Sequence, residues 1–82
     1  MRLDKYLKIS RLIKRRTVAN EAAAAGRVTV NGKIAKPSAD VKPGDVPEIR
    51  FGAKTLRARV DSVQEFAKKE QAAEMYTLLS DP

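Results

Sequence analysis

The chain has 82 residues, a length that accommodates one small domain. It contains neither cysteine nor histidine, which excludes a disulfide framework, a thiolate metal site and the most common general base. Its 17 basic and 10 acidic side chains give a formal net charge of +7. Because the sequence shows neither an apolar run of membrane-spanning length nor a secretory signal pattern, we expect a soluble, cytoplasmic protein without a metal or other cofactor.

The positive charge is concentrated in the first half of the chain. Residues 1–36 carry ten basic side chains against two acidic ones, a net of +8, whereas residues 37–82 carry seven against eight. A basic half beside a balanced one is typical of a protein that binds nucleic acid on one face. We favour this interpretation over a merely soluble cationic surface by roughly three to one. An anionic membrane is a third possibility, but the apolar residues are needed for a core.

The first seven residues predict a helix, because Leu3, Tyr6 and Leu7 recur at helical spacing. Asp4 falls in the first turn of this helix, where a carboxylate suits the helix dipole. It is placed either to serve the helix and pair with Lys8, four residues on, or to orient nearby arginines. We hold these two interpretations of Asp4 about even.

Residues 8–16 form a basic connection to a second predicted helix, which runs from Val18 to Ala25. Thr17 is the expected N-cap of this helix, since its hydroxyl can accept from a free backbone N–H group of the next turn. Val18, Ala22 and Ala25 form its apolar stripe, and glycine at position 26 ends it. Together the two helices predict an αα-hairpin.

After the second helix the apolar period changes to an alternation that is typical of strands. Asn31-Gly32 is a strong hairpin signal, and Pro47 is expected at the start or edge of a strand because it lacks an amide donor. The predicted strands cover residues 27–30, 33–36, 48–51 and 55–60. The fold class is therefore α+β, with two N-terminal helices packed on a small, mostly antiparallel sheet and a possible C-terminal helix.

The pattern is weaker at the C-terminal end. Val63 to Leu79 mixes apolar and charged residues, which predicts an extension that is partly helical or loosely docked. We therefore divide the chain into a domain of residues 1–62 and an extension of residues 63–82. Of the few aromatic residues, Tyr6 and Phe51 are expected to be buried.

Several motifs, in this order, resemble the alpha-L RNA-binding motif, the S-four-like domain that a small-subunit ribosomal protein shares with pseudouridine synthases and some tyrosyl-tRNA synthetases. They are Arg2-Leu3-Asp4-Lys5-Tyr6-Leu7, Ser10-Arg11, Arg15-Arg16-Thr17, Gly26-Arg27-Val28-Thr29-Val30-Asn31-Gly32 and Lys42-Pro43-Gly44-Asp45. The resemblance covers about residues 1–60, and its ordered combination is specific although Asn-Gly alone is weak. The sequence departs from the family pattern at Val46-Pro47, where the family usually continues directly into an apolar strand.

The opening Met1–Lys5, the segment Ser10–Thr17 and the tail are similar to the RqcP (YabO) family, and more distantly to the ribosome-associated heat-shock protein of the same domain family. The resemblance implies a monomeric factor that binds the dissociated large ribosomal subunit carrying peptidyl-tRNA and contacts tRNA and large-subunit rRNA. It further implies support of C-terminal alanine tailing of stalled chains, together with an RqcH-like tRNA-recruiting factor. The alternatives are a large-subunit recycling or heat-shock RNA-binding factor, or a structural ribosome-associated protein.

An enzyme is not expected, because the sequence offers no nucleophile–base pair. The pseudouridine synthases that carry the motif have a separate catalytic domain, for which this chain has no room. A DNA target is also less suited, since the second helix offers mainly alanines and no base-reading side chains.

The candidate RNA-binding residues combine basic side chains with a helix N-terminus, which is itself an anion site. Arginine can bind phosphate with two parallel donors and can also stack on bases. The candidates are Arg2, Ser10, Arg11, Lys14, Arg15, Arg16, Thr17, Arg27, Asn31 and Lys33. Three of them have local alternatives: Arg27 and Ser10 as helix caps, and Asn31 as a turn residue, which we favour over RNA contact by roughly two to one.

Overall fold

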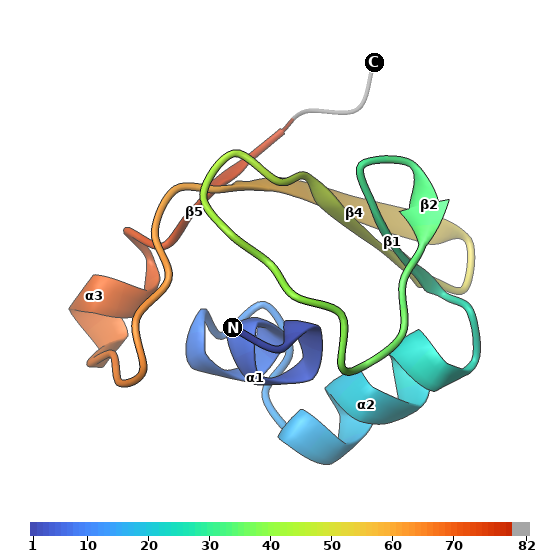
Figure 1. Cartoon of the computed structure of the whole chain (residues 1–82), viewed down its shortest axis with the longest axis horizontal. Helices are drawn as coiled ribbons and strands as arrows, with labels where there is room; N and C mark the ends of the chain where they lie inside the picture. The colour runs from blue at the N-terminus through green and yellow to red at the C-terminus, as the bar shows by residue number, and fades with distance from the viewer. Residues whose placement is uncertain (80–82) are drawn as a thin grey trace.

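The computed structural model describes residues 1–79, and it confirms the α+β class. Five strands form one antiparallel sheet in the order β2-β1-β3-β4-β5, and helices α1 and α2 cover one of its faces (Figure 1). The elements are α1 (Leu3–Ile9), α2 (Arg16–Ala24), β1 (Val28–Val30), β2 (Lys33–Ile34), β3 (Pro47–Phe51), β4 (Lys54–Val60), α3 (Lys69–Ala72) and β5 (Tyr76–Leu78). No helix within residues 1–79 is long and apolar enough to cross a membrane.

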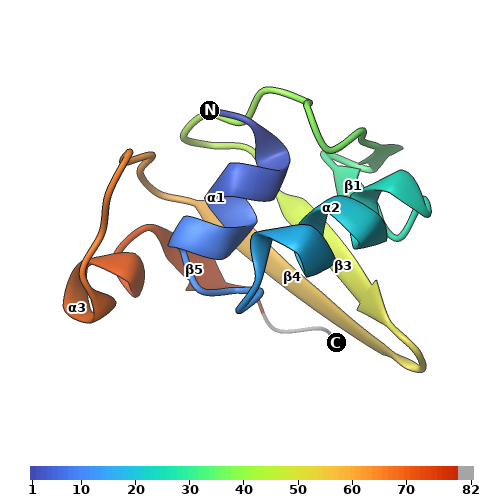
Figure 2. The ribbon, with the colours of Figure 1, turned by 90° about the horizontal axis from the view of Figure 1, so that it is seen from below.

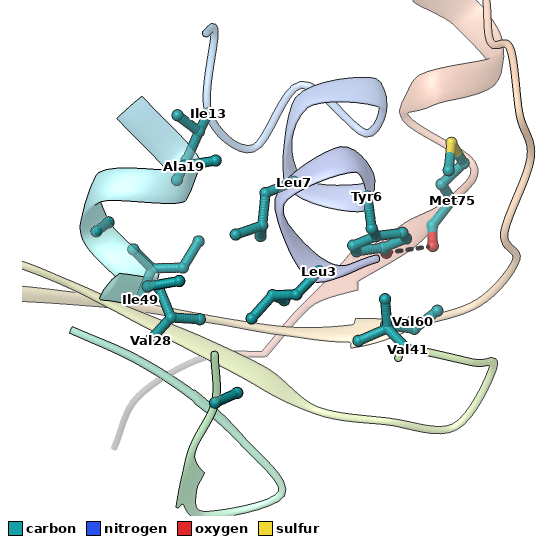
Figure 3. Close-up of a cluster of buried hydrophobic side chains, with 13 residues drawn as sticks. Leu3, Tyr6, Leu7, Ile13, Ala19, Val28, Val41, Ile49, Val60 and Met75 are labelled. Carbon is teal, nitrogen blue, oxygen red and sulfur yellow. Dashed lines mark hydrogen bonds between the residues drawn. The ribbon is translucent and has the colours of Figure 1, made fainter. Parts of the chain in front are cut away.

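The core lies between α1 and the sheet. Leu3, Tyr6 and Leu7 of α1 are fully buried, as their spacing predicted. Leu3 and Leu7 lie on the side of Val28 of β1 and Ile49 of β3, which come from neighbouring strands, whereas Tyr6 lies on the side of Val60 and Met75 (Figure 3). Because each large apolar side chain contributes about 1.5–3 kcal/mol when buried, these contacts hold α1 rigidly on the sheet.

Helix α2 begins earlier than predicted. Its first residue is Arg16, and Arg15 is the N-cap without a side-chain cap hydrogen bond, so the prediction of Thr17 as N-cap is wrong. The buried stripe is also different from the predicted one, because Val18 is 44% exposed. The stripe consists of Ala19, Ala22 and Ala23. Packing against α1 and β1, which a local pattern does not contain, sets the rotation of the helix.

The Asn31-Gly32 turn joins β1 to β2 as predicted. Both residues have positive φ values, 55° and 84°, which match the twist that a two-residue hairpin requires. The return strand is shorter than predicted and covers only Lys33–Ile34. Pro47 is the first residue of β3, where it faces Val30 across the ladder, so its predicted position at a strand start is confirmed.

The C-terminal segment from Val63 to Leu79 is not one continuous helix, the possibility that the sequence left open. Only α3, a single turn, is helical, and β5 pairs with the free edge of β4. Met75, between them, is fully buried, and its carbonyl oxygen accepts the Tyr6 hydroxyl at 2.8 Å (Figure 3). The division of the chain at residue 62 stays a prediction.

Phe51 is not buried as expected, since it ends β3 and is 43% exposed. The end of β3 and its turn into β4 lie beyond the part of the sheet that α1 and α2 cover. Figure 2 shows this arrangement from below, with α1 and α2 in front of the sheet and the turn between β3 and β4 extending past them. The alternation of β3 therefore predicted the strand correctly. The helices are too short to cover the last residues of β3, so these residues are exposed.

Candidate nucleic-acid interface

A buried carboxylate lies at the meeting point of α1 and α2. The side chain of Asp4 is only 3% exposed. It accepts hydrogen bonds from Arg2, through Nε at 3.2 Å and Nη2 at 3.3 Å, and from Nη2 of Arg16 at 3.4 Å. Nδ2 of Asn20 donates at 3.2 Å and the backbone N–H group of Lys5 at 2.8 Å. Donors from the chain before α1, from α1 and from α2 thus converge on one group.

Asp4 is ionised at neutral pH. Burial would by itself raise the pKa of its carboxyl group, but hydrogen bonds from Asn20 and Arg2, the charge of Arg16 and the Lys5 amide together lower the pKa below its ordinary value. Of the two interpretations that the sequence left open, the contacts favour the orientation of arginines. The predicted pair with Lys8 is not among the ion pairs formed within residues 1–79.

Arg2 and Arg16 remain accessible despite these bonds. Their side chains are 52% and 48% exposed, so each guanidinium group has N–H donors directed at solvent. Two cations against one anion leave a local excess of one positive charge. The arrangement can therefore bind an anion without first breaking the bonds to Asp4.

The N-terminus of α2 adds to the same surface. Since the N-cap makes no side-chain hydrogen bond, no side chain caps the free N–H groups of the first turn. A hollow of about 300 Å³ opens beside this turn and is lined by Asp4, Arg16, Thr17 and Asn20. A helix N-terminus with an adjacent guanidinium group is suited to phosphate.

The other candidates in the connection between α1 and α2 differ in exposure. Arg11, Lys14 and Arg15 are exposed, and Arg11 has a positive φ of 64°. Ser10 is 1% exposed, and its hydroxyl donates to the Leu7 carbonyl at 3.3 Å. Ser10 thus lies below the surface in the role of a local cap, and only its neighbours reach solvent.

Arg27, Asn31 and Lys33 lie near the opposite end of α2. They are exposed, but Arg16 begins α2 and Arg27 lies beyond its other end, and a nine-residue helix is about 13 Å long. The side chain of Asn31 donates to the Asp45 carboxylate at 3.0 Å and accepts from the backbone N–H group of Val46 at 2.9 Å. Asn31 therefore joins two loops, in agreement with the structural role that we favoured for it.

Asn20 contacts Asp4 at this site, and the sequence patterns did not predict this contact. It lies one helical turn after Arg16, a spacing that places both on the same face of α2. Its partner Asp4 is sixteen residues away in the chain, so no local sequence pattern could predict the hydrogen bond. Within the described residues no cluster of acidic side chains could hold a metal ion, and every buried side-chain polar atom has a partner.

Comparisons with known proteins identify relatives of this chain. The family model of the S4 domain matches residues 1–47 of the sequence. The RQC P-site tRNA stabilizing factor of Listeria innocua is 62% identical over 81 residues, which cover 99% of this chain and 88% of the relative. The factor of the same name from Bacillus subtilis is 56% identical over 81 residues, which cover 99% and 94%.

Among solved structures, the trimeric structure of Vibrio cholerae heat shock protein 15 has a TM-score of 0.87 and 28% identity, and the match covers 98% of this chain and 82% of that one. The similarity extends through β5, beyond the residues that the domain model matches. These matches confirm the fold and the family resemblance that the ordered motifs predicted.

Proposed function

Because the chain belongs to the S4 domain family and, within it, to the family of RQC P-site tRNA stabilizing factors, we propose that it stabilises tRNA in the P site of the large ribosomal subunit during ribosome quality control. The observation that carries this proposal in the structure is the convergence of Arg2 and Arg16 at the uncapped N-terminus of α2. In our proposal this face binds the RNA backbone, and the protein contacts both tRNA and large-subunit rRNA.

The chemistry of the face is suited to RNA. Neutralising phosphates releases counterions, which supplies most of the sequence-independent affinity. Arginine presents a planar fork of donors to a phosphate, and the helix N-terminus adds aligned N–H groups. The exposed cations Arg11, Lys14 and Arg15 lie in the connection that leads into α2, where they extend the same binding surface.

The remaining parts of the proposal concern class, partners and location. An RNA-binding domain and relatives named as stabilizing factors support a non-catalytic role. We propose that the protein acts in the cytoplasm as a monomer, works with an RqcH-like tRNA-recruiting factor and supports alanine tailing of stalled chains. Residues 63–82 would form an extension of the RNA-binding domain.

A heat-shock or recycling factor is the less favoured alternative. A heat shock protein 15 homologue of Aeromonas salmonicida is 32% identical over 75 residues, which cover 92% of this chain but only 57% of the relative. Identity to the stabilizing factors of Listeria innocua and Bacillus subtilis is much higher and extends over most of both chains.

The double variant Arg2→Ala/Arg16→Ala tests the face. We expect it to co-sediment with large subunits carrying peptidyl-tRNA at least about tenfold more weakly, because two charge-assisted contacts are lost. The matched control is Arg50→Ala/Arg57→Ala, which removes the same charge from exposed positions of β3 and β4. These positions alternate with the buried Ile49 and Ala58, so they lie on the sheet face away from the helices.

The salt dependence of binding distinguishes binding through this face from binding through the net charge of the protein. The wild type should lose affinity steeply with salt, and the Arg2→Ala/Arg16→Ala slope should be shallower by about one to two units. Equal losses for the two double variants would show that total charge, and not this face, carries binding. Unchanged binding of Arg2→Ala/Arg16→Ala would refute the proposal that this face binds RNA.

A further inference from the structure

An acidic side chain occupies the centre of the most basic part of the protein. Residues 1–36 contain only two acidic residues, and one of them, Asp4, is buried against arginines. A protein that bound RNA through net charge alone would bind more tightly without this carboxylate. Burying a charge is also unfavourable unless the charge is well paired. The position of Asp4 therefore requires an explanation beyond attraction between the protein and a polyanion.

The geometry around Asp4 links two arginines that come from separate segments. Arg2 precedes α1 and engages the carboxylate with two donors, Nε to Oδ1 and Nη2 to Oδ2. Arg16 is the first residue of α2 and donates through Nη2 to Oδ1. Within residues 1–79 neither guanidinium group forms another ion pair. The carboxylate is thus the shared contact that sets the position of one arginine relative to the other.

Asp4 is itself held firmly. Its neighbours Leu3 and Tyr6 are fully buried, which fixes the backbone of α1. Oδ1 accepts the Lys5 amide and Oδ2 accepts Nδ2 of Asn20, so the carboxylate group has little freedom to rotate. Because the carboxylate is fixed, its bonds restrict the rotamers of the two arginines before RNA binds. Without Asp4 these side chains would lose that rotamer entropy on binding.

We propose that Asp4 is a positioning residue that determines specificity, because it presents Arg2 and Arg16 as a preorganised pair to phosphate groups of a structured RNA. The proposal rests on the proposed function, since it concerns the same face. A flexible, unpaired RNA can adapt to arginines in any arrangement and gains nothing from the fixed pair. A folded tRNA or rRNA helix presents phosphates at set positions and does gain from it.

The substitution Asp4→Asn separates positioning from charge, because the two predict changes of opposite sign. It raises the formal net charge from +7 to +8, so pure electrostatics predicts tighter binding to every RNA. Positioning predicts that binding to large subunits carrying peptidyl-tRNA weakens about tenfold, while binding to polyuridine is unchanged or stronger. The measured quantity is the ratio of the two affinities, determined at one salt concentration.

A second measurement tests whether Asp4 acts through the arginines. In the Arg2→Ala/Arg16→Ala background, Asp4→Asn should cause no further loss of subunit binding. A merely structural role would lower both affinities together and would add to the loss in that background. Asn20→Ala is a charge-neutral companion that removes one anchor of the carboxylate, and it should lower the affinity ratio in the same direction by a smaller factor. This variant keeps the test decisive should Asp4→Asn fail to fold.

The proposal is overturned if Asp4→Asn tightens binding to both RNAs, if it weakens both equally, or if it adds to the loss in the double-arginine background. With an unfolded Asp4→Asn protein, an unchanged ratio for Asn20→Ala overturns it as well. Failure of the proposed function is a different result: the wild type would then show no preference for tRNA-carrying subunits over polyuridine.

Discussion

At the scale of single residues, Tyr6 shows how one hydroxyl group joins the two ends of the chain. Its hydroxyl donates to the carbonyl oxygen of Met75 at 2.8 Å. This carbonyl oxygen also accepts the backbone N–H groups of Asp61 and Ser62, at 2.8 and 3.2 Å. Burial, followed by the nearby Asp61 and Tyr76, raises the pKa of Tyr6 above its ordinary value.

Tyr6→Phe should therefore lower the free energy of unfolding by only about 1 kcal/mol at neutral pH, because the Met75 carbonyl keeps its other two donors. Since the pKa of Tyr6 is higher in the folded state, its contribution is fully present below about pH 10 and is lost as the pH rises further. Urea unfolding at neutral and alkaline pH measures both effects. The variant should lose less stability in alkali than the wild type, and an equal loss would contradict this role.

At the scale of elements, small side chains allow α2 to lie close to its neighbours. Ala19 and Ala23 are 0% and 3% exposed, whereas Ala24, next in the chain, is exposed. Interiors are packed closely enough that an added branched side chain has no free space to enter. The alanine run is thus a packing feature that positions Arg16 at the start of the helix.

Ala19→Leu should lower the free energy of unfolding by about 1–3 kcal/mol through overpacking, and it should weaken RNA binding because Arg16 moves with α2. Ala24→Leu is the matched control on the exposed side of the same helix, and it should change stability by less than about 0.5 kcal/mol. Chemical denaturation of both variants makes the comparison. A tolerated leucine at position 19 would show that α2 is not held closely at this point.

At the scale of the whole molecule, carboxylates connect segments that are distant in sequence. Asp40 pairs with the N-terminal amino group at 2.7 Å, and Glu65 pairs with Lys5 of α1. Asp61 bonds to Thr77 of β5 and to Arg59. These partners lower the pKa of each of the three carboxyl groups, with the hydrogen bond from the first-named partner as the largest cause.

The pKa is lower in the folded state for all three of these carboxyl groups and for Asp4, so their effect on stability depends on pH in the same direction. A pKa that is lower in the folded state contributes stability above the unfolded-state value, and this contribution is lost as the pH falls through the folded-state value. We therefore expect the thermal unfolding midpoint to fall as the pH drops below about 4, chiefly through the buried Asp4, because solvent screens the pairs of the three exposed carboxyl groups. Asp4→Asn should make this fall smaller, because the main titrating group is gone. A midpoint that is independent of pH in this range would show that the pairs add nothing to stability.

The local patterns of the sequence were sufficient for much of the fold. The spacing of Leu3, Tyr6 and Leu7 predicted α1 and its buried face, and Asn31-Gly32 predicted the first hairpin. The ordered motifs predicted the family, because their combination is rarer than any of their parts. Arg2 and Arg16 were predicted as RNA contacts and lie together at the surface, while their contact with RNA stays a proposal.

Other features depended on contacts between distant residues, which no local window contains. The C-terminal segment forms β5 because β4 offers it an open edge, a partner that lies outside the segment's own local pattern. Phe51 is exposed because it ends β3, next to the turn that extends past the helical layer. By itself the sequence determined α1, the first hairpin, the charge asymmetry and the family. The tertiary structure decided that Asp4 and Asn20, sixteen residues apart, meet between α1 and α2 and hold the two arginines in place, because only the packing of these helices brings their side chains within hydrogen-bonding distance.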